Sequence, residues 1–207
     1  MNKIKNPFSF YSILTNPVLG YVPLAKILID QKIPFLQLRI KNDTKEHIKE
    51  IAIEIARICL GTDTKFIIND DPQLVLECGA DGVHLGQDDM PYQEARRILG
   101  GEKIIGLSTH NPSQVRAANK LNPDYIGMGP VYTTPTKQIL DPVLGVSGLR
   151  EMLALTTLPA VAIGGIDFTN IHDVKSAGAQ NICAVRLINE AKEPIKILDK
   201  LKTICPW

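Results

Sequence analysis

One pattern recurs eight times along the chain. Short apolar or alternating runs, typical of β-strands, are separated by longer stretches with the apolar spacing of amphipathic helices. This alternation indicates βα units whose strands pair in parallel. The expected strands are residues 10–14, 35–39, 65–68, 82–85, 104–107, 125–128, 160–163 and 182–185.

Eight such units in 207 residues predict an α/β fold, a single (β/α)8 TIM barrel over residues 1–207, at the lower end of the usual size for that fold. An open, doubly wound sheet is the alternative. In both architectures ligands bind at the carboxyl ends of the strands, so the residues that follow each strand are the functional candidates.

Three of the intervening stretches begin with helix-capping signals. Asp43 stands three residues before Glu46, as in a capping box. Asn111 precedes Pro112, which loses no hydrogen bond at the first helical position. Asn170 begins a third such stretch.

Charge and cysteine content narrow the class of partner. The formal net charge is only +1 and no block of like charges occurs, which argues against nucleic-acid and membrane partners and favours a small polar or anionic ligand. The four cysteines are far apart without a C-x-x-C pair, so we expect reduced structural thiols. The first 20 residues lack a signal-like apolar run, and no run reaches the roughly 18 residues of a membrane span. We therefore expect a cytoplasmic protein, and a homo-oligomer stays open.

The stretch "FIINDDPQLV", residues 66–75, places two acids directly after an apolar strand. Asp71 followed by Pro72 matches an N-cap and first helical position. That role leaves Asn69 and Asp70 unexplained, although both leave the strand where a barrel has its site. Asp70 is therefore a candidate ligand for a metal or substrate.

The next unit, "GVHLGQDDM", supplies a second acid. Alternation places His84 on the opposite face from Val83 and Leu85, and Asp88 and Asp89 follow in the loop. Acids that leave adjacent parallel strands can meet at the rim, and two carboxylates with water and substrate phosphate are a usual set of ligands for Mg²⁺. One of Asp88 and Asp89 is expected to join Asp70, and the other to cap the helix that follows.

Cations and phosphate-binding groups follow other strands. Gln37, Arg39 and Lys41 alternate with apolar residues and share one face, which in a barrel points to the interior and its mouth. A buried cation there requires an anion. The other candidates at strand ends are Ser108, His110, the threonines of residues 133–136, Lys137 and the pair Gly164–Gly165.

The charge balance favours a particular ligand. Arg39, Lys41 and Lys137 against Asp70 and Asp89 leave the rim at about +1. A bare divalent cation would make the rim strongly positive, because unit charges 4 Å apart interact by ~4 kcal/mol at an effective dielectric near 20. A metal diphosphate would balance both the cations and the metal.

The sequence resembles a known family. The segments "QLRIK", "IINDD", "ADGVHLGQDD", "GLSTH", "DYIGMGPVYTTPTK" and "AIGGI" stand in the order typical of the thiamine phosphate synthase and TenI-like barrel family, across residues 37–166. The resemblance implies a Mg²⁺-dependent transferase that joins hydroxymethylpyrimidine diphosphate to thiazole phosphate. The products are thiamine phosphate and diphosphate, which in this family departs early and leaves a pyrimidine cation.

The resemblance also implies roles for individual residues. Asp70 and Asp89 would bind Mg²⁺, and Gln37 and His84 would line the pyrimidine side. His84 could equally be a satisfied histidine of the barrel interior. The residues implied to hold the diphosphate and carry catalysis are Arg39, Lys41, Asn69, Ser108 and Lys137, of which Asn69 binds only. Those implied to contact the thiazole phosphate are Thr134, Thr136 and Gly165.

One position departs from the family pattern. Arg186 stands near the end of the last strand, where the family usually has a small residue. Three interpretations stay open: a direct phosphate contact, occlusion of the acceptor pocket, or an ion pair with Glu190.

Three rival functions use the same residues. A TenI-like thiazole tautomerase would move a proton with His110 but needs no diphosphate site. A phosphate-binding barrel without catalysis would keep the anion site alone. A Schiff-base aldolase would use Lys137, although the polar surroundings of this lysine do not provide the desolvation that such chemistry requires.

Overall fold

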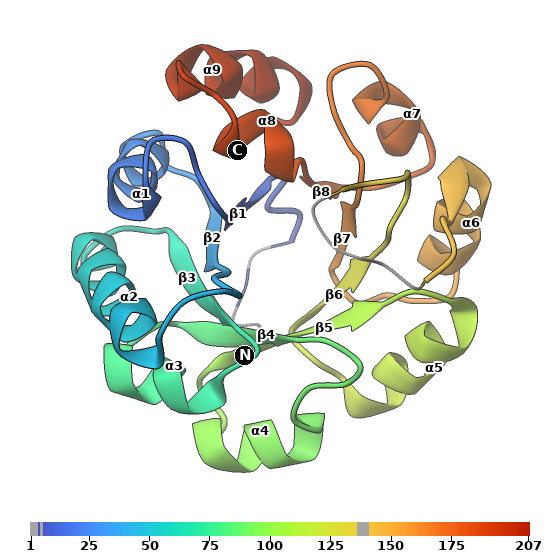
Figure 1. The fold of residues 1–207 in the computed structure, drawn as a ribbon. Coiled ribbons are helices and arrows are strands. Elements are labelled where there is room, and N and C mark those ends of the chain that lie inside the picture. Colours follow the sequence, from blue (N-terminus) through green and yellow to red (C-terminus); the bar gives the residue numbers. More distant parts are fainter. Residues whose placement is uncertain (1–3, 5, 136–140) are drawn as a thin grey trace.

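The computed structural model, which describes residues 4, 6–135 and 141–207, is a closed ring of parallel strands with helices outside (Figure 1). The eight strands pair in sequence order from β1 to β8. Their bounds are β1 Tyr11–Leu14, β2 Phe35–Leu38, β3 Lys65–Asn69, β4 Gly82–Leu85, β5 Ile104–Thr109, β6 Tyr125–Met128, β7 Ala160–Ile163 and β8 Asn181–Cys183.

Helices follow the strands and form the outer layer (Figure 1). Their bounds are α1 Tyr21–Asp30, α2 Lys45–Cys59, α3 Pro72–Cys78, α4 Tyr92–Leu99, α5 Pro112–Leu121, α6 Gly145–Leu153, α7 Ile171–Ser176, α8 Val185–Asn189 and α9 Pro194–Ile204. No helix in the described ranges has the length and apolar character that a bilayer crossing requires.

The TIM barrel predicted from the alternation is confirmed, and the open sheet is wrong. The ring closes where Phe10 bridges Ile182 in parallel, with the Ile182 amide donating to the Ser9 carbonyl at 3.0 Å. The last strand ends earlier than expected from the apolar run 182–185. It stops at Cys183, and Val185 already begins α8, because a short apolar run does not distinguish a strand from a buried helical turn.

Two asparagines stabilise the seam between β8 and β1. Asn181 accepts from the backbone amides of Phe8 and Ser9 at 2.8 and 3.0 Å. Asn189 accepts from the Thr15 amide at 2.8 Å and donates to the Ile13 carbonyl at 2.7 Å. Both side chains are buried, so they satisfy backbone groups that the short last strand leaves unpaired.

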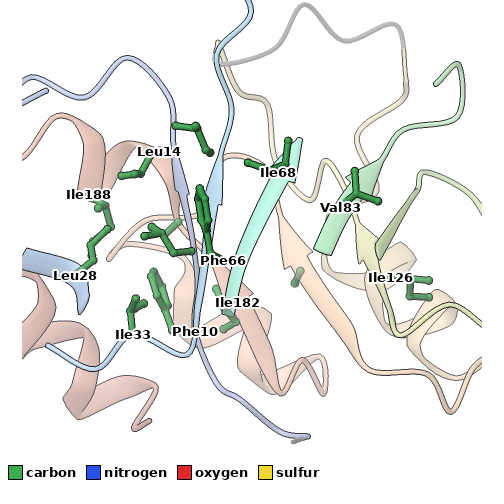
Figure 2. Packing of buried hydrophobic residues seen from close by; sticks show 14 of the residues in the cluster. Phe10, Leu14, Leu28, Ile33, Phe66, Ile68, Val83, Ile126, Ile182 and Ile188 are labelled. Carbon is green, nitrogen blue, oxygen red and sulfur yellow. The ribbon is translucent and has the colours of Figure 1, made fainter. Parts of the chain in front are cut away.

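The larger core lies between the strands and the helices. It includes strand residues such as Phe66, Val83 and Ile126 and helical residues such as Leu28 and Ile188, which are distributed around the barrel (Figure 2). These side chains are nearly or completely buried. This layer holds the helices on the barrel through apolar burial.

A smaller core fills the bottom of the barrel. Phe8, from the segment before β1, packs against Phe35 in a tilted arrangement with ring centroids 4.3 Å apart. Tyr11, Ile67 and Tyr125 lie in the same inner cluster. The barrel interior is therefore filled from the amino ends of the strands, and space for a ligand is left at the carboxyl ends.

The helix starts agree only in part with the capping signals. Asn111 caps α5 as predicted and accepts from the Gln114 amide at 3.0 Å. The cap of α2 is Thr44 rather than Asp43, whose carboxylate accepts from the Thr44 amide. Asn170 stands at the start of α7, but its side chain bonds to Asp167 and Gly165 instead of the helix.

Candidate active site

A cavity of about 410 Å³ opens at the carboxyl ends of the strands. It brings together all the predicted site residues that the structure describes. These are Gln37, Arg39, Lys41, Asn69, Asp70, His84, Asp89, Ser108, Thr134 and Gly165. The predicted Thr136 and Lys137 lie outside the described residues.

The two acids of the stretch "FIINDDPQLV" have separate roles, as expected. Asp71 caps α3 and accepts from the amides of Gln73 and Leu74 at 2.9 and 3.0 Å. Asp70 instead lines the cavity, with a left-handed backbone at φ 66°. Its amide donates to the His84 carbonyl at 2.8 Å. Such a conformation costs energy for a non-glycine residue and is typical of functional positions.

Asp70 and Asp89 meet at the rim from β3 and from the loop after β4. Their carboxyl groups are in hydrogen-bonding contact. Asp70 also pairs with the Lys41 ammonium, and Asp89 accepts from the Gly86 amide at 2.6 Å. A side chain on Gly86 would place its Cβ 2.9 Å from the Asp89 carboxylate, which would have to shift to make room.

The paired carboxyl groups have opposite pKa shifts. Burial alone would raise the pKa of Asp70, but hydrogen bonds from Asp89 and Lys41 and the Lys41 charge lower it. Burial and the contact with Asp70 raise the pKa of Asp89. When two carboxyl groups are this close, ionisation of one disfavours ionisation of the other. A divalent cation that takes two carboxylates fits this pair.

The expected helix cap in the Asp88–Asp89 loop is wrong. Helix α4 begins after Pro91 without a side-chain cap, since Asp89 is engaged by the Gly86 amide. Asp88 lines the cavity as well. Within the described ranges no group of three or more His, Cys, Asp or Glu residues could form a metal site by itself.

Arg39 provides a cation that the protein leaves available. Its guanidinium makes one long hydrogen bond, 3.4 Å to the Thr15 hydroxyl. Among residues 4, 6–135 and 141–207 it takes part in no ion pair. A partly buried guanidinium that faces a cavity and pairs with no described carboxylate is suited to bind an anionic ligand.

A chain of hydrogen bonds runs beneath these charges. Gln37 donates to the Tyr11 hydroxyl at 2.9 Å, and the hydroxyls of Tyr11 and Tyr125 are 2.7 Å apart. His84 lies 3.0 Å from the Tyr125 hydroxyl through Nδ1 and 2.9 Å from the Ser108 hydroxyl through Nε2. Both ring nitrogens of His84 are therefore hydrogen-bonded to the protein.

Tyr11 and Tyr125 belong to the site but were not predicted from the sequence. Both lie on expected strands and could have been noticed, because each occupies an alternating position that faces the barrel interior. Their contact across 114 positions of sequence depends on the register of the whole ring, which local spacing does not reveal.

Glycines after β7 shape the opposite side of the cavity. Gly165 has φ 65°, and a Cβ there would lie 2.6 Å from the Thr133 carbonyl oxygen. Gly164, at φ 101°, would clash with Pro130 in the same way. The glycine backbone therefore packs against the loop after β6 more closely than other residues allow, and both glycines line the cavity.

Arg186 also lines this side of the cavity. The interpretation as an ion pair with Glu190 is wrong, because no pair joins these two residues within the described chain. The Arg186 charge contributes to lowering the pKa of Asp167, after the hydrogen bonds from Thr169. A phosphate contact and occlusion of the pocket stay open for this residue.

His110 faces the cavity from the end of β5. Its Nδ1 lies 2.6 Å from the Gly129 carbonyl oxygen, so Nδ1 carries a proton. Its Nε2 lies 3.6 Å from the Asp141 carboxylate. The site thus contains a second imidazole, whose Nε2 faces a carboxylate.

Comparisons with known proteins agree with this geometry. A family model described as thiamine monophosphate synthase matches residues 18–188. A thiamine-phosphate synthase of Lawsonia intracellularis is 37% identical over 185 residues, which cover 88% of this chain and 85% of that protein. A thiamine-phosphate synthase of Gloeobacter violaceus is 40% identical over 182 residues, which cover 88% of this chain. The chain spans about half of that longer relative, 53% of its length.

Among solved structures, a thiamine phosphate pyrophosphorylase from Pyrococcus furiosus aligns with a TM-score of 0.86. The sequence identity is 29%, and the alignment covers 99% of this chain and 96% of that one. The match thus includes the whole barrel and the strand ends that carry the cavity.

Proposed function

The chain belongs to the thiamine monophosphate synthase family, and on that premise we propose that it joins hydroxymethylpyrimidine diphosphate to thiazole phosphate. The products would be thiamine phosphate and diphosphate. The observation that carries the proposal is the single cavity in which Arg39 and Lys41 face the paired carboxyl groups of Asp70 and Asp89. Neither a single phosphate nor a neutral ligand accounts for both sets of charges.

Mg²⁺ is the proposed cofactor, held by Asp70 and Asp89. The fit rests on two carboxyl groups in contact, which repel each other once both are ionised. Only two carboxylates are needed, because Mg²⁺ keeps several waters and takes its other ligands from substrate phosphate. When bound, the ion would neutralise charge on the departing diphosphate.

The cationic and polar residues of the rim would stabilise the leaving group. Arg39, Lys41, Asn69 and Ser108 line the cavity near the two acids. Their donors can follow the negative charge that grows on the diphosphate as the bond to the pyrimidine breaks. Lys137, which belongs to the undescribed segment, is proposed for the same role.

The deeper and opposite walls would hold the two rings. The interior wall near Gln37 and His84 also contains the aromatic ring of Tyr125, which suits a flat pyrimidine. Gly165, Thr134 and the undescribed Thr136 are proposed to bind the phosphate of the thiazole. This arrangement would place the thiazole nitrogen toward the carbon that the diphosphate leaves.

The proposal extends to partners and location. The partners are the two small-molecule substrates, with no role for nucleic acid or membrane. Four free thiols among the described residues support the expectation of a reducing, cytoplasmic compartment.

The test is diphosphate release with both substrates, with and without Mg²⁺, in wild type, Asp70→Asn and Asp71→Ala. Asparagine tolerates the left-handed backbone of position 70, so we expect Asp70→Asn to fold normally and lose turnover. Asp71→Ala removes a helix cap and should cost about 1 kcal/mol of stability with little effect on activity. Reversed kinetic effects would overturn the assignment of the two acids.

A second candidate function is supported by His110, whose Nε2 faces Asp141. A thiazole tautomerase would use this imidazole to move a proton. Conversion of a non-aromatic thiazole precursor, lost in His110→Asn and without any diphosphate release, would favour the tautomerase over the synthase.

A further inference from the structure

In the hydrogen-bonded chain under the rim, the donors and acceptors available determine which group donates in each hydrogen bond. It comprises Gln37, Tyr11, Tyr125, His84 and Ser108. The first three side chains are at most 2% exposed. Water therefore does not satisfy these groups, and each hydroxyl hydrogen must find its acceptor within the protein.

The hydrogen-bonded chain begins at the side-chain amide nitrogen of Gln37, which can only donate. The Gln37 amide nitrogen gives its hydrogen to the Tyr11 oxygen, so it offers Tyr11 no acceptor. In the described part of the protein, the other partner of the Tyr11 hydroxyl is Tyr125. The Tyr11 hydrogen must therefore point to the Tyr125 oxygen, since the reverse direction leaves a buried donor unpaired.

The need for an acceptor for each buried hydroxyl hydrogen also fixes the hydrogen bonds of His84. Because the Tyr125 oxygen accepts from Tyr11, its own hydrogen points to Nδ1 of His84. Nδ1 is then an acceptor, and the neutral ring carries its proton on Nε2. The ring stacks on Tyr125 with 5.5 Å between the centroids and lies against the backbone of Gly127, where an added Cβ would be 3.4 Å from its Cε1.

Ser108 is the end of the chain and faces the cavity. Its hydroxyl oxygen accepts from Nε2 of His84, and among the described residues Nε2 is its one side-chain partner. The Ser108 hydrogen is thus left to point into the cavity. A hydroxyl oriented in this way donates to an anion and does not have to be reoriented when the anion binds.

We propose that the buried chain from Gln37 through Tyr11 and Tyr125 holds His84 as its Nε2–H tautomer and thereby makes Ser108 a fixed donor to the ligand anion. Tyr11 and Tyr125 are then positioning residues, which act through His84 and Ser108. Burial raises the pKa of both tyrosines, so each keeps the hydrogen that the chain needs. The consequence for diphosphate rests on the proposed function, whereas the tautomer does not.

The tautomer is measured directly by ¹H–¹⁵N NMR of the histidine rings in the free protein. His84→Gln identifies the signal of His84 among the four histidines. We expect a roughly tenfold or larger excess of the Nε2–H form. Tyr92→Phe, a tyrosine outside the cavity, is the matched control and should leave the signal unchanged. A predominant Nδ1–H form in the wild type would overturn the proposal.

A second variant should reverse the direction of the hydrogen bonds from residue 37 to Ser108. Gln37→Glu introduces a carboxyl group, whose ionisation is read from its ¹³C shift after selective labelling. When ionised it accepts from Tyr11, every hydroxyl turns round, and His84 must carry its proton on Nδ1. When protonated it donates as glutamine does, and the Nε2–H form must persist. An ionised carboxyl group with the Nε2–H form, or a protonated one with the Nδ1–H form, would refute the coupling.

The functional consequence is tested by a double-mutant cycle on diphosphate release. Ser108→Ala should lower kcat by about tenfold to a hundredfold in the wild type, the usual effect of losing a hydrogen bond to a charged group. Where the carboxyl group of Gln37→Glu is ionised, Ser108 donates to His84 instead, and its removal should change kcat less than threefold. Equal effects in both backgrounds would refute a fixed donor. If no release occurs at all, the synthase assignment fails while the tautomer result stands.

Discussion

Replacing Arg39 by methionine removes a charge from the cavity while it leaves the fold nearly untouched. Among the described residues the guanidinium makes only a long hydrogen bond to Thr15, and methionine keeps the aliphatic volume of the stem. A unit charge 4 Å from an anionic oxygen contributes ~4 kcal/mol at an effective dielectric of 20. The cavity mouth is open to water, so we take half of that as the lower bound. The expected loss in kcat/KM is therefore about 30-fold to 1,000-fold.

The assay is diphosphate release at varied pyrimidine diphosphate and saturating thiazole phosphate, with the melting temperature measured in parallel. Arg150→Met on α6, an exposed arginine outside the cavity, is the matched control and should retain full activity. If charge on the leaving group is what Arg39 stabilises, kcat should fall as well as the apparent affinity. A loss below tenfold, with an unchanged melting temperature, would refute the electrostatic role.

Three other predictions follow from the contacts. Asn189→Ala should destabilise the fold by about 2–5 kcal/mol in urea unfolding, because it strands buried backbone groups at the seam. Burial raises the pKa of Cys59 to about 12, so ionisation of this thiol favours the unfolded chain. The stability that it contributes is complete below about pH 8.5 and is lost as the pH rises toward 12, at up to about 1.4 kcal/mol per pH unit; Cys59→Ala should show a shallower decline. In calorimetry, the Mg²⁺ affinity of Lys41→Met should depend less on added diphosphate than the affinity of the wild type. The reason is that Lys41 neutralises Asp70 in the protein without metal and is replaced there when the metal binds.

The architecture could be predicted because each βα unit is locally consistent. The apolar strand, the cap and the amphipathic helix all indicate the same element, as in "FIINDDPQLV", where Asp71 caps α3 as predicted. Local sequence signals do not identify the cap where several neighbouring residues could each occupy the N-cap position. In the run Asn42, Asp43 and Thr44, each side chain is a possible cap, and Thr44 takes the position by accepting from the His47 amide.

The charged rim could also be predicted, for a physical reason. Charged groups at the ends of buried strands are costly unless they bind something, so Arg39, Lys41 and Asp70 stand out in the sequence as candidates for function. Their meeting in one cavity then follows from the parallel order of the strands. Asp70 and Asp71 could likewise be told apart, because the Asp71 carboxylate caps α3 and the Asp70 carboxylate has no such role in the local backbone structure.

The buried hydrogen-bonded chain carries no such signal. Tyr11 and Tyr125 are ordinary strand residues by propensity, and their hydroxyls become informative only when the ring brings them within 2.7 Å of each other. Gly106 illustrates the dependence: a Cβ there would lie 2.1 Å from the Tyr125 ring, so a glycine on β5 makes room for the link. The rim provides charge, which sequence reveals, whereas the orientation of a neutral donor such as Ser108 depends on contacts that only the closed barrel creates.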